Sequence, residues 1–445
     1  MSQSEFQFMD KQTGALRSFA AAMMLAAGLS APAQAIDLSW SGFATLGYAQ
    51  SDENFQYLRW IDDGGTFNSE TVAGLQLDVQ FAPRWAATVQ MRAAPATDHD
   101  SRWDVEPSWA FVAWRPADGW LLRAGKLRAP LYLYSEALDV GVAHDMARLP
   151  MEMYSVSPIN EFVGVSATYD WTLDKAGDYL LSVTLFRGGD EIAIRGWVPN
   201  GLPPVLQSGA SYLDFDLTAT GLVFDLSIGA DTRLRALALH ARLKSDVASR
   251  VSYPRVELGP GLVYYKVDQA FPGPPIDFQN VIHNDLYTLG MDHRFGDGWR
   301  VTAEYARIEQ RDVEFGSDAH GGYVALFKEW GRFTPYVSFG SLKSTDEQLD
   351  IYRNLVSNPL PPGSLGGVEA LVNAAQEAAA VSLLATDQRT FALGTSIIVP
   401  GGKLKMEWAH TWIDDTSQLI DERPGDSVLK DRQLNVWTLN YSVAF

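Results

Sequence analysis

The chain has 445 residues, no cysteine and a formal net charge of −19, with 47% hydrophobic and 12% aromatic residues. A chain without cysteine cannot form disulfides, thiolate metal sites or a cysteine nucleophile. The acidic balance argues against a nucleic-acid binder, because that class of protein needs a basic surface for the phosphates. Frequent Trp and Tyr are instead typical of a protein at a membrane interface.

The first 35 residues have the pattern of a secretory signal peptide. Lys11 and Arg17 precede an uncharged run at 18–29, and Ala33-Gln34-Ala35 follows as a cleavage site. The apolar run is too short to span a bilayer. We therefore expect export with removal of 1–35, which leaves 36–445 as the mature domain.

An alternation of apolar and polar residues with a period of two dominates the mature sequence. In chain order it predicts sixteen strands: 38–50, 69–81, 85–93, 105–114, 120–126, 162–171, 179–186, 218–227, 233–244, 285–295, 299–310, 321–330, 332–344, 388–399, 403–413 and 432–445. The Ala-rich run 366–386 contains Glu and Gln and follows several prolines. It predicts a helix on a loop and not a membrane span.

The connections between these strands alternate in length. Short ones fall at 82–84, 115–119, 172–178, 228–232, 296–298, 331 and 400–402. Long ones fall at 51–68, 94–104, 127–161, 187–217, 245–284, 311–320, 345–387 and 414–431. Short turns at one end and long loops at the other are typical of an up-and-down transmembrane barrel, whose closure leaves no free edge.

The late strands indicate which face meets lipid. Leu404, Met406 and Trp408 alternate with Lys403, Lys405 and Glu407. An apolar face outside and a charged face inside is the inverse of a soluble barrel. A soluble two-sheet sandwich also alternates, but it would not explain the two classes of connection. The sequence thus predicts an all-β fold, a 16-stranded antiparallel transmembrane β-barrel.

The connection after the fifth strand differs from the other loops. Residues 125–164 have no period of two, and they combine Pro, Met and Tyr with charges of both signs. A loop this long in a compact β protein is uncommon, and its large apolar side chains do not suit a solvated linker. We expect 129–161 to fold inside the barrel as a constriction loop. Its Tyr and Met residues could instead form an apolar slide for a substrate.

Three stretches resemble the 16-stranded porins of Gram-negative outer membranes. They are the first strand, at 40–48; the run 122–126, followed by the long third loop; and the terminal Phe445 after alternating aromatic residues. The resemblance implies a homotrimer in outer-membrane lipid that passes small hydrophilic solutes by diffusion. It also implies that the outer-membrane assembly machinery recognises Phe445. The family's Pro-Glu-Phe-Gly-Gly loop motif is absent.

In that family an acidic constriction loop faces a basic ladder on the barrel wall. The matching candidates for a pore constriction are Lys126, Arg128, Glu136, Asp139, Arg59, Arg92, Asp145, Arg148 and Glu152, with Glu161 as a further acid. Lys126 and Arg123 cannot both face inward on a regular strand, so one of them requires a bulge or the start of the loop. Each of these residues could also be a solvated or structural ion-pair partner.

Motifs of catalysis and of metal binding are missing. The seven histidines have no HExxH spacing, and neither GxSxG nor GxxxxGK[ST] occurs. We expect no enzyme activity, no cofactor and no metal. The acidic pairs at 62–63, 414–415 and 421–422 could bind Ca²⁺ on loops, although solvated loop tips are the simpler reading. The alternative function is an outer-membrane barrel enzyme or receptor with a plugged lumen.

Overall fold

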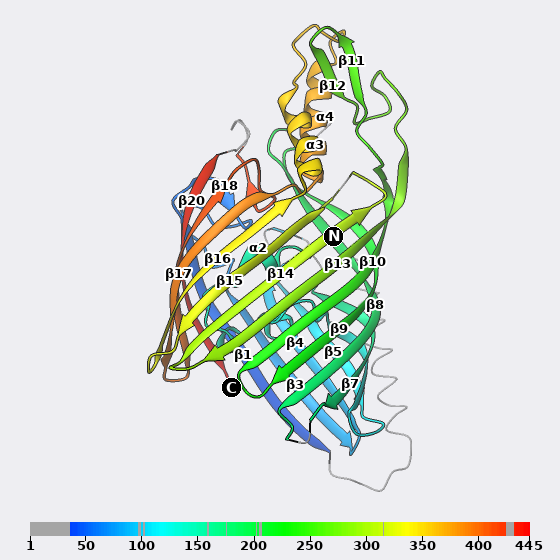
Figure 1. Ribbon diagram of the computed structural model, residues 1–445. Helices are drawn as coiled ribbons and strands as arrows, with labels where there is room; N and C mark the ends of the chain where they lie inside the picture. The colour runs from blue at the N-terminus through cyan, green and yellow to red at the C-terminus, as the bar shows by residue number, and fades with distance from the viewer. Residues whose placement is uncertain are drawn as a thin grey trace.

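The computed structural model describes residues 36–445 except 97–98, 101–102, 158–159, 175, 202, 204–206, 315 and 424–430. Sixteen antiparallel strands close into one barrel, and the first strand pairs with the last (Figure 1). The predicted 16-stranded antiparallel barrel is confirmed. The predicted signal peptide, 1–35, lies outside the described residues.

The barrel strands follow the chain and agree with the predicted positions. They are β1 (Asp37–Ser51), β3 (Val72–Ala82), β4 (Trp85–Pro95), β5 (Trp103–Trp114), β6 (Trp120–Arg128), β7 (Glu161–Thr172), β8 (Tyr179–Val198), β9 (Gly209–Ile228), β10 (Thr232–Arg250), β13 (Phe278–Phe295), β14 (Trp299–Arg311), β15 (Ala319–Lys328), β16 (Phe333–Ser344), β17 (Asp387–Val399), β18 (Gly402–Ile413) and β20 (Arg432–Ala444).

Two predicted loops are shorter than expected, because four strands continue past their predicted ends. β8 and β9 have 20 residues each, β10 has 19 and β13 has 18. The predicted loop 187–217 is mostly strand, with Ile192 opposite Phe215. The β8–β9 ladder keeps its register throughout, so apolar side chains continue to alternate on one face.

The remaining elements lie in the long connections. β2 (Gln56–Tyr57) pairs with β19 (Ile420–Asp421), and β11 (Arg255–Gly259) pairs with β12 (Leu262–Tyr265). The predicted Ala-rich helix is α4 (Glu369–Ser382); α3 (Asp346–Ser357) was not predicted. These two helices, β11 and β12 share a hydrophobic core of their own above the barrel (Figure 1). Among the described residues, no helix is long and apolar enough to cross a membrane.

The outer face of the barrel is apolar, as the strand phases predict. On β20, Trp437, Leu439 and Tyr441 are exposed, whereas the intervening Thr438 and Asn440 are buried. Aromatic pairs mark the end with short turns: the Trp85 and Trp114 rings stack at 5.3 Å. Such aromatic girdles flank the lipid-facing band of outer-membrane barrels.

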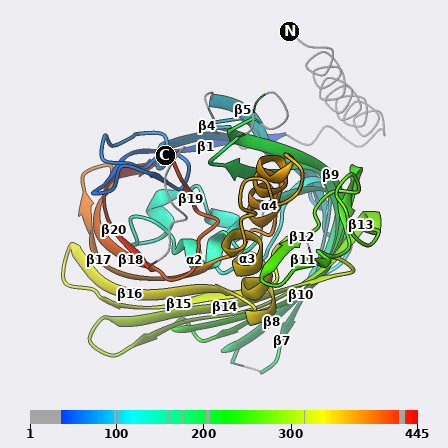
Figure 2. The ribbon, with the colours of Figure 1, turned by 90° about the horizontal axis from the view of Figure 1, so that it is seen from above.

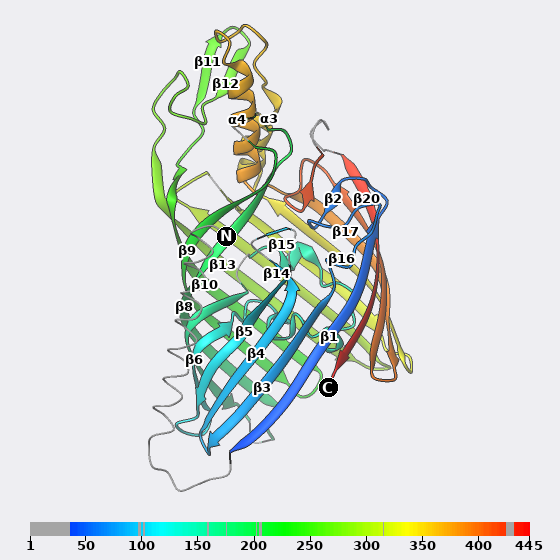
Figure 3. The ribbon, with the colours of Figure 1, turned by 180° about the vertical axis from the view of Figure 1, so that it is seen from behind.

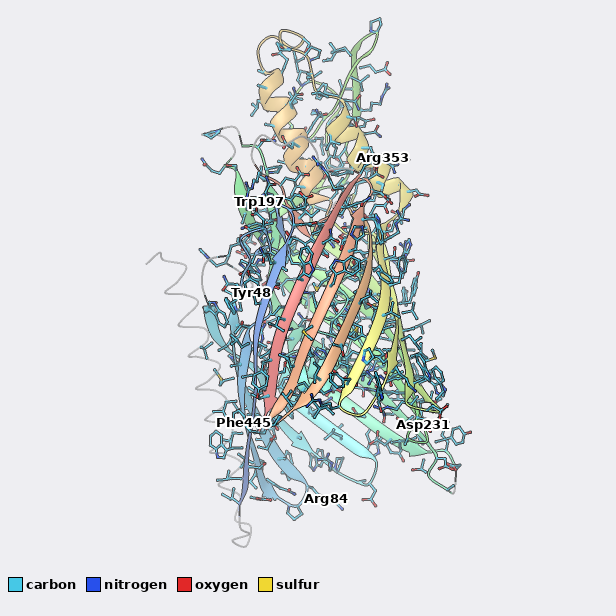
Figure 4. The ribbon with its side chains drawn as sticks, turned by 90° about the vertical axis from the view of Figure 1, so that its left-hand side faces the viewer. Tyr48, Arg84, Trp197, Asp231, Arg353 and Phe445 are labelled. Atoms are coloured by element: carbon cyan, nitrogen blue, oxygen red, sulfur yellow. The ribbon has the colours of Figure 1, made fainter. Side chains whose placement is uncertain are left out.

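The two ends of the barrel differ (Figure 4). Arg84 and Asp231, both in short turns, lie at the same end as Phe445, while Trp197 and Arg353 lie at the end with the long loops. From behind, β3 to β6 form the shorter side of the wall and β8 to β10 the taller side (Figure 3).

Candidate functional site

The connection between β6 and β7, residues 129–160, is the candidate functional segment. It contains the short helices η1 (Ser135–Ala137), η2 (Gly141–Ala143) and α2 (Met151–Tyr154). Figure 2 shows it within the outline of the barrel. The segment buries large apolar side chains in the same core as inward-facing residues of the barrel wall. These segment residues are Leu131, Tyr132, Met146, Leu149, Met153 and Tyr154. The segment therefore packs as part of the protein interior.

One fastening is the carboxylate of Glu304, on β14. Its Oε2 accepts a hydrogen bond from the backbone N–H of Leu133 at 2.7 Å. Its Oε1 accepts from the hydroxyl groups of Tyr154 at 2.7 Å and Tyr323 at 2.9 Å. Glu304 is 5% exposed. A buried carboxylate requires such donors, so this contact holds the two ends of the segment to one point of the wall.

A second fastening is Asp145, one of the predicted constriction residues. Its carboxylate lies 2.6 Å from Arg300 and 2.8 Å from Lys403, and it accepts a hydrogen bond from Ser396 at 2.8 Å. Beside it, Lys405 Nζ donates to two backbone carbonyls of the segment, at 2.9 and 3.0 Å. These contacts bind residues 141–146 to β14, β17 and β18.

Glu152, also predicted, lies on α2 and is turned to the wall. It accepts hydrogen bonds from Gln388 at 2.8 Å and from the Thr390 hydroxyl. The wall has glycines here, whose missing side chains leave room for α2. A Cβ on Gly321 would lie 2.1 Å from the Glu152 carbonyl oxygen. A Cβ on Gly340 would lie 3.0 Å from Glu152 Oε2. The two glycines therefore let α2 approach the strands closely.

Four of the predicted residues meet on the other side of the segment, at Asp139. Arg128 Nη2 lies 2.5 Å and Arg92 Nε 3.2 Å from its carboxylate. Arg92 also pairs with Glu106 at 3.0 Å, and Lys126 pairs with Glu161 at 3.0 Å. Three cations and three acids from β4, β5, β6, β7 and the segment thus form one network, which we call the Asp139 cluster.

On a regular strand Arg123 and Lys126 would face opposite sides of the wall, and Gly125 is the residue that lets both side chains face the interior. Gly125 has a φ of +135°, where a side chain would be strained, and a Cβ there would lie 2.2 Å from a carbonyl oxygen of β5. Arg123 and Lys126 both reach acids of the interior, Glu136 at 4.0 Å and Glu161. A glycine is required at 125 for this local irregularity.

The other predicted residues are more dispersed. Arg148 pairs with Glu70 of the first long connection at 2.6 Å and is largely buried. Glu136 is 45% exposed at its side chain and lies 4.0 Å from both Arg123 and Arg235. Arg59 is not part of the Asp139 cluster.

Arg59 instead belongs to a cluster at the end with the long loops. Asp100 lies 2.7 Å from Arg59 and 2.9 Å from Arg195, and Arg195 also contacts Asp421 at 2.5 Å. Burial opposes ionisation of Asp100, but hydrogen bonds from Arg195, Tyr212 and Arg59 lower its pKa. Burial raises the pKa of Asp421 despite its contact with Arg195. This mouth cluster links connections that are distant in sequence.

A cavity of about 590 Å³ lies between the segment and the long loops. Its lining includes inward-facing residues of β1, β4, β8, β9, β10, β13, β14, β18 and β20, so it lies inside the barrel. Segment residues such as Leu138, Asp139 and Tyr154 face it from one side, and Trp60, Leu419 and Asp421 of the loops face it from the other. The volume is in the range of small-molecule sites.

The partners of the segment are what sequence reasoning missed. Arg300, Glu304, Tyr336, Lys403 and Lys405 fasten it to the wall. Four of them, Arg300, Glu304, Lys403 and Lys405, stand on the polar faces of their strands, and the alternation assigns such faces to the interior. Strand phase is therefore the signal that could have identified them, while the register against the segment requires the fold.

Three of the six acids proposed for Ca²⁺ on the loops are engaged in ion pairs. Asp414 pairs with Arg389, Asp415 with Arg353, and Asp421 with Arg195. In the part of the chain that the structure describes, no group of three or more His, Asp or Glu residues is placed to hold a metal ion.

Comparison with known proteins rests on the fold. No family model matches the sequence, and no curated protein matches it. The outer-membrane channel DcaP of Acinetobacter baumannii superposes with a TM-score of 0.50 at 11% identity, covering 94% of this chain and 100% of that chain. The trimer form of OmpT, an outer membrane protein of Vibrio cholerae, gives 0.49 at 11% identity over 93% and 100%. An anion-selective porin from Comamonas acidovorans gives 0.46 at 11% identity over 92% and 100%.

The protein is an outer-membrane β-barrel. A closed 16-stranded barrel with an apolar outer face and aromatic girdles has the architecture of that class, and it places the protein in the outer membrane of a Gram-negative bacterium. Its fold is that of the 16-stranded porins, as the likeness to DcaP shows.

Proposed function

We propose that the protein is a porin through which small hydrophilic solutes and ions diffuse passively. The observation that carries this proposal is the fastening of residues 129–160 to opposite sides of the barrel. Asp145 binds β14 and β18, and Asp139 binds β4 and β6. A segment held in this way narrows the bore of a wide barrel without closing the barrel itself.

The Asp139 cluster supplies the charges that a selective constriction needs. Opposed rings of charge in a confined bore make an ion's passage depend on its sign. Lys126 and Arg92 are about one fifth exposed at their side chains, and Glu106 is 35% exposed. These groups are therefore open to a passing solute, whereas the more buried Arg128 acts as a brace for Asp139. Glu136 completes the candidate constriction.

Export, assembly and association belong to the same proposal. Residues 1–35 direct export and are removed, and Phe445 at the end of β20 is recognised during barrel assembly. Leu38, Trp40, Leu46 and Leu75 expose an apolar outer surface on β1 and β3 that suits a homotrimer contact. Cross-linking of the detergent-purified protein to a trimer, followed by a mass measurement, tests this association.

Planar-bilayer recording tests the proposed function. A trimeric porin gives an ohmic current that rises in three equal steps per insertion. Removal of residues 132–153 should enlarge each step and weaken the preference between cations and anions. Protein that runs as a folded, heat-modifiable barrel and yet shows no conductance would refute the proposal.

A second candidate is a receptor or enzyme with a plugged lumen, and two observations favour it. Several inward-facing polar side chains are fully buried, including Thr302, Gln388 and Ser442 at 0% exposure. Loops also cover the mouth, where β2 pairs with β19. Silent bilayers with well-folded protein would support this second candidate.

A further inference from the structure

The cavity between the segment and the long loops has one strongly apolar side. Five residues from five strands form it: Ile194, Phe215, Leu243, Ile282 and Ile308. We call them the apolar wall. The five strands are consecutive neighbours around the barrel, in the order β14, β13, β10, β9 and β8, so the apolar wall is continuous. Leu243 faces Ile282 directly across the strand pair.

An apolar wall of this extent is unexpected in a pore for hydrophilic solutes. On β10 the usual arrangement of an apolar outer face and a polar inner face is reversed. Leu237, Leu239 and Leu243 face inward, whereas Arg242 and Lys244 face outward. Apolar surface that meets water costs free energy in proportion to its area. Four of the wall residues, Phe215, Leu243, Ile282 and Ile308, are 2–5% exposed, so the apolar surface that meets water is small. A ligand with an apolar body would cover that surface and displace its water.

Charged residues also line the cavity, and cations are in excess among them. Of the ionisable residues that line it, apart from His144, five are cationic and three are acidic: Arg59, Arg92, Arg148, Arg195 and Lys405, against Glu70, Asp139 and Asp421. The net charge of −19 of the whole chain is therefore not the charge of this cavity.

Lys405 is the cation whose charge is least compensated. The four arginines each have a carboxylate partner within 3.2 Å. Lys405 Nζ donates only to the carbonyls of Gly141 and Met146, and among the described residues no carboxylate lies within 4.0 Å of it. An ammonium group has three donors, and burial of an unpaired cation is costly. An anionic group in the cavity would offset that cost.

We propose that the cavity binds small amphipathic organic anions, with a single carboxylate at one end and an aromatic or aliphatic body at the other. The body lies on the apolar wall, and the carboxylate lies towards Lys405 and the lining arginines. This inference rests on the proposed function, since it names the solutes that the porin would select. The volume of about 590 Å³ accommodates a body of one aromatic ring with a short chain.

Isothermal titration calorimetry on the detergent-purified full chain tests both parts of this assignment. Phenylbutyrate is the probe, phenylbutylamine has the same body with the opposite charge, and butyrate keeps the charge without the ring. Saturable binding of phenylbutyrate, at least about ten-fold tighter than of either control, is the expected result. Equal binding of the amine would overturn the charge assignment, and equal binding of butyrate would overturn the role of the apolar wall.

A pair of variants on β10 locates the site. Leu243→Asn changes the apolar wall, and Leu237→Asn makes the same change on the same inward face outside the cavity; both leucines are about equally buried, at 4% exposure. Leu243→Asn should weaken phenylbutyrate binding about ten-fold, and Leu237→Asn should leave it unchanged. Equal effects of the two variants would refute the site.

The same protein in planar bilayers separates this inference from the proposed function. Conductance without phenylbutyrate binding would support the proposed porin function and refute the amphipathic-anion site. Binding without conductance would sink the porin and retain an amphipathic-anion site in a plugged barrel. Binding with conductance should appear as a saturable decrease of current as phenylbutyrate is added.

Discussion

Replacement of Asp145 by Asn tests whether the fastened segment governs the current. The side chain keeps its shape but loses the charge that pairs with Arg300 and Lys403. Both cations remain partly or wholly buried, and removal of one partner of a buried ion pair costs about 3–5 kcal/mol. The hold on residues 141–146 should therefore weaken to the two hydrogen bonds from Lys405, so that they detach from the wall for part of the time, while Glu304 still holds Leu133 and Tyr154.

In single-channel recordings, Asp145→Asn should give larger steps with rapid current fluctuations. Asp170→Asn is the matched control, because Asp170 lies at an exposed position of β7 and bonds Ser182 there. That surface change should alter the stability by no more than about 0.5 kcal/mol and leave the current unchanged. If Asp145→Asn lowers the stability and yet its steps match those of the unmodified protein, the segment does not line the ion pathway.

Three further outcomes follow from particular contacts. Gly321→Ala places a methyl group where the Glu152 carbonyl lies, so it should lower the stability to denaturant by about 1–3 kcal/mol and speed proteolysis near α2. Gly259→Ala, with no atom within 4 Å of the added Cβ, should do neither. Phe445→Ala should reduce the fraction of heat-modifiable barrel in outer-membrane preparations, and an unchanged fraction would remove its assembly role. Arg195→Gln leaves two acids of the mouth cluster without their shared cation, so amide exchange around residues 99–100 and 418–422 should accelerate, and unchanged exchange would contradict that linkage.

The barrel could be predicted from the sequence because its determinants are local. Each strand carries its own alternation, and the turns carry their own Gly and Pro. On β20 the phase of Trp437 and Leu439 against Thr438 and Asn440 was enough to orient the strand. The predicted end of β8 was too early and the predicted start of β9 too late, since alternation above the membrane no longer separates lipid from lumen.

The candidate site could be predicted only in part. The presence of charge in 129–161 was evident, and Arg92, Lys126, Arg128 and Asp139 do meet. The partners of other charges are far away in the sequence, as for Asp145 with Arg300, so they could not be identified without the fold. The apolar wall could not be predicted from the sequence either. A Leu on β10 is expected to face lipid until the register of the whole barrel is known.

The unequal strand lengths make the barrel a tube cut obliquely at its outer end. A strand of 20 residues is roughly 65 Å long at ~3.3 Å per residue, whereas β6 has only nine residues and spans about 30 Å. The hydrophobic band of an outer membrane is about 25 Å tall, so β8 to β10 rise far above it on one flank. For the proposed porin, we expect a solute to approach over the low rim beside β3 to β6 and to meet the tall flank, whose outer half carries the apolar wall. We expect entry from the side, along the cell surface, and not straight down the barrel axis.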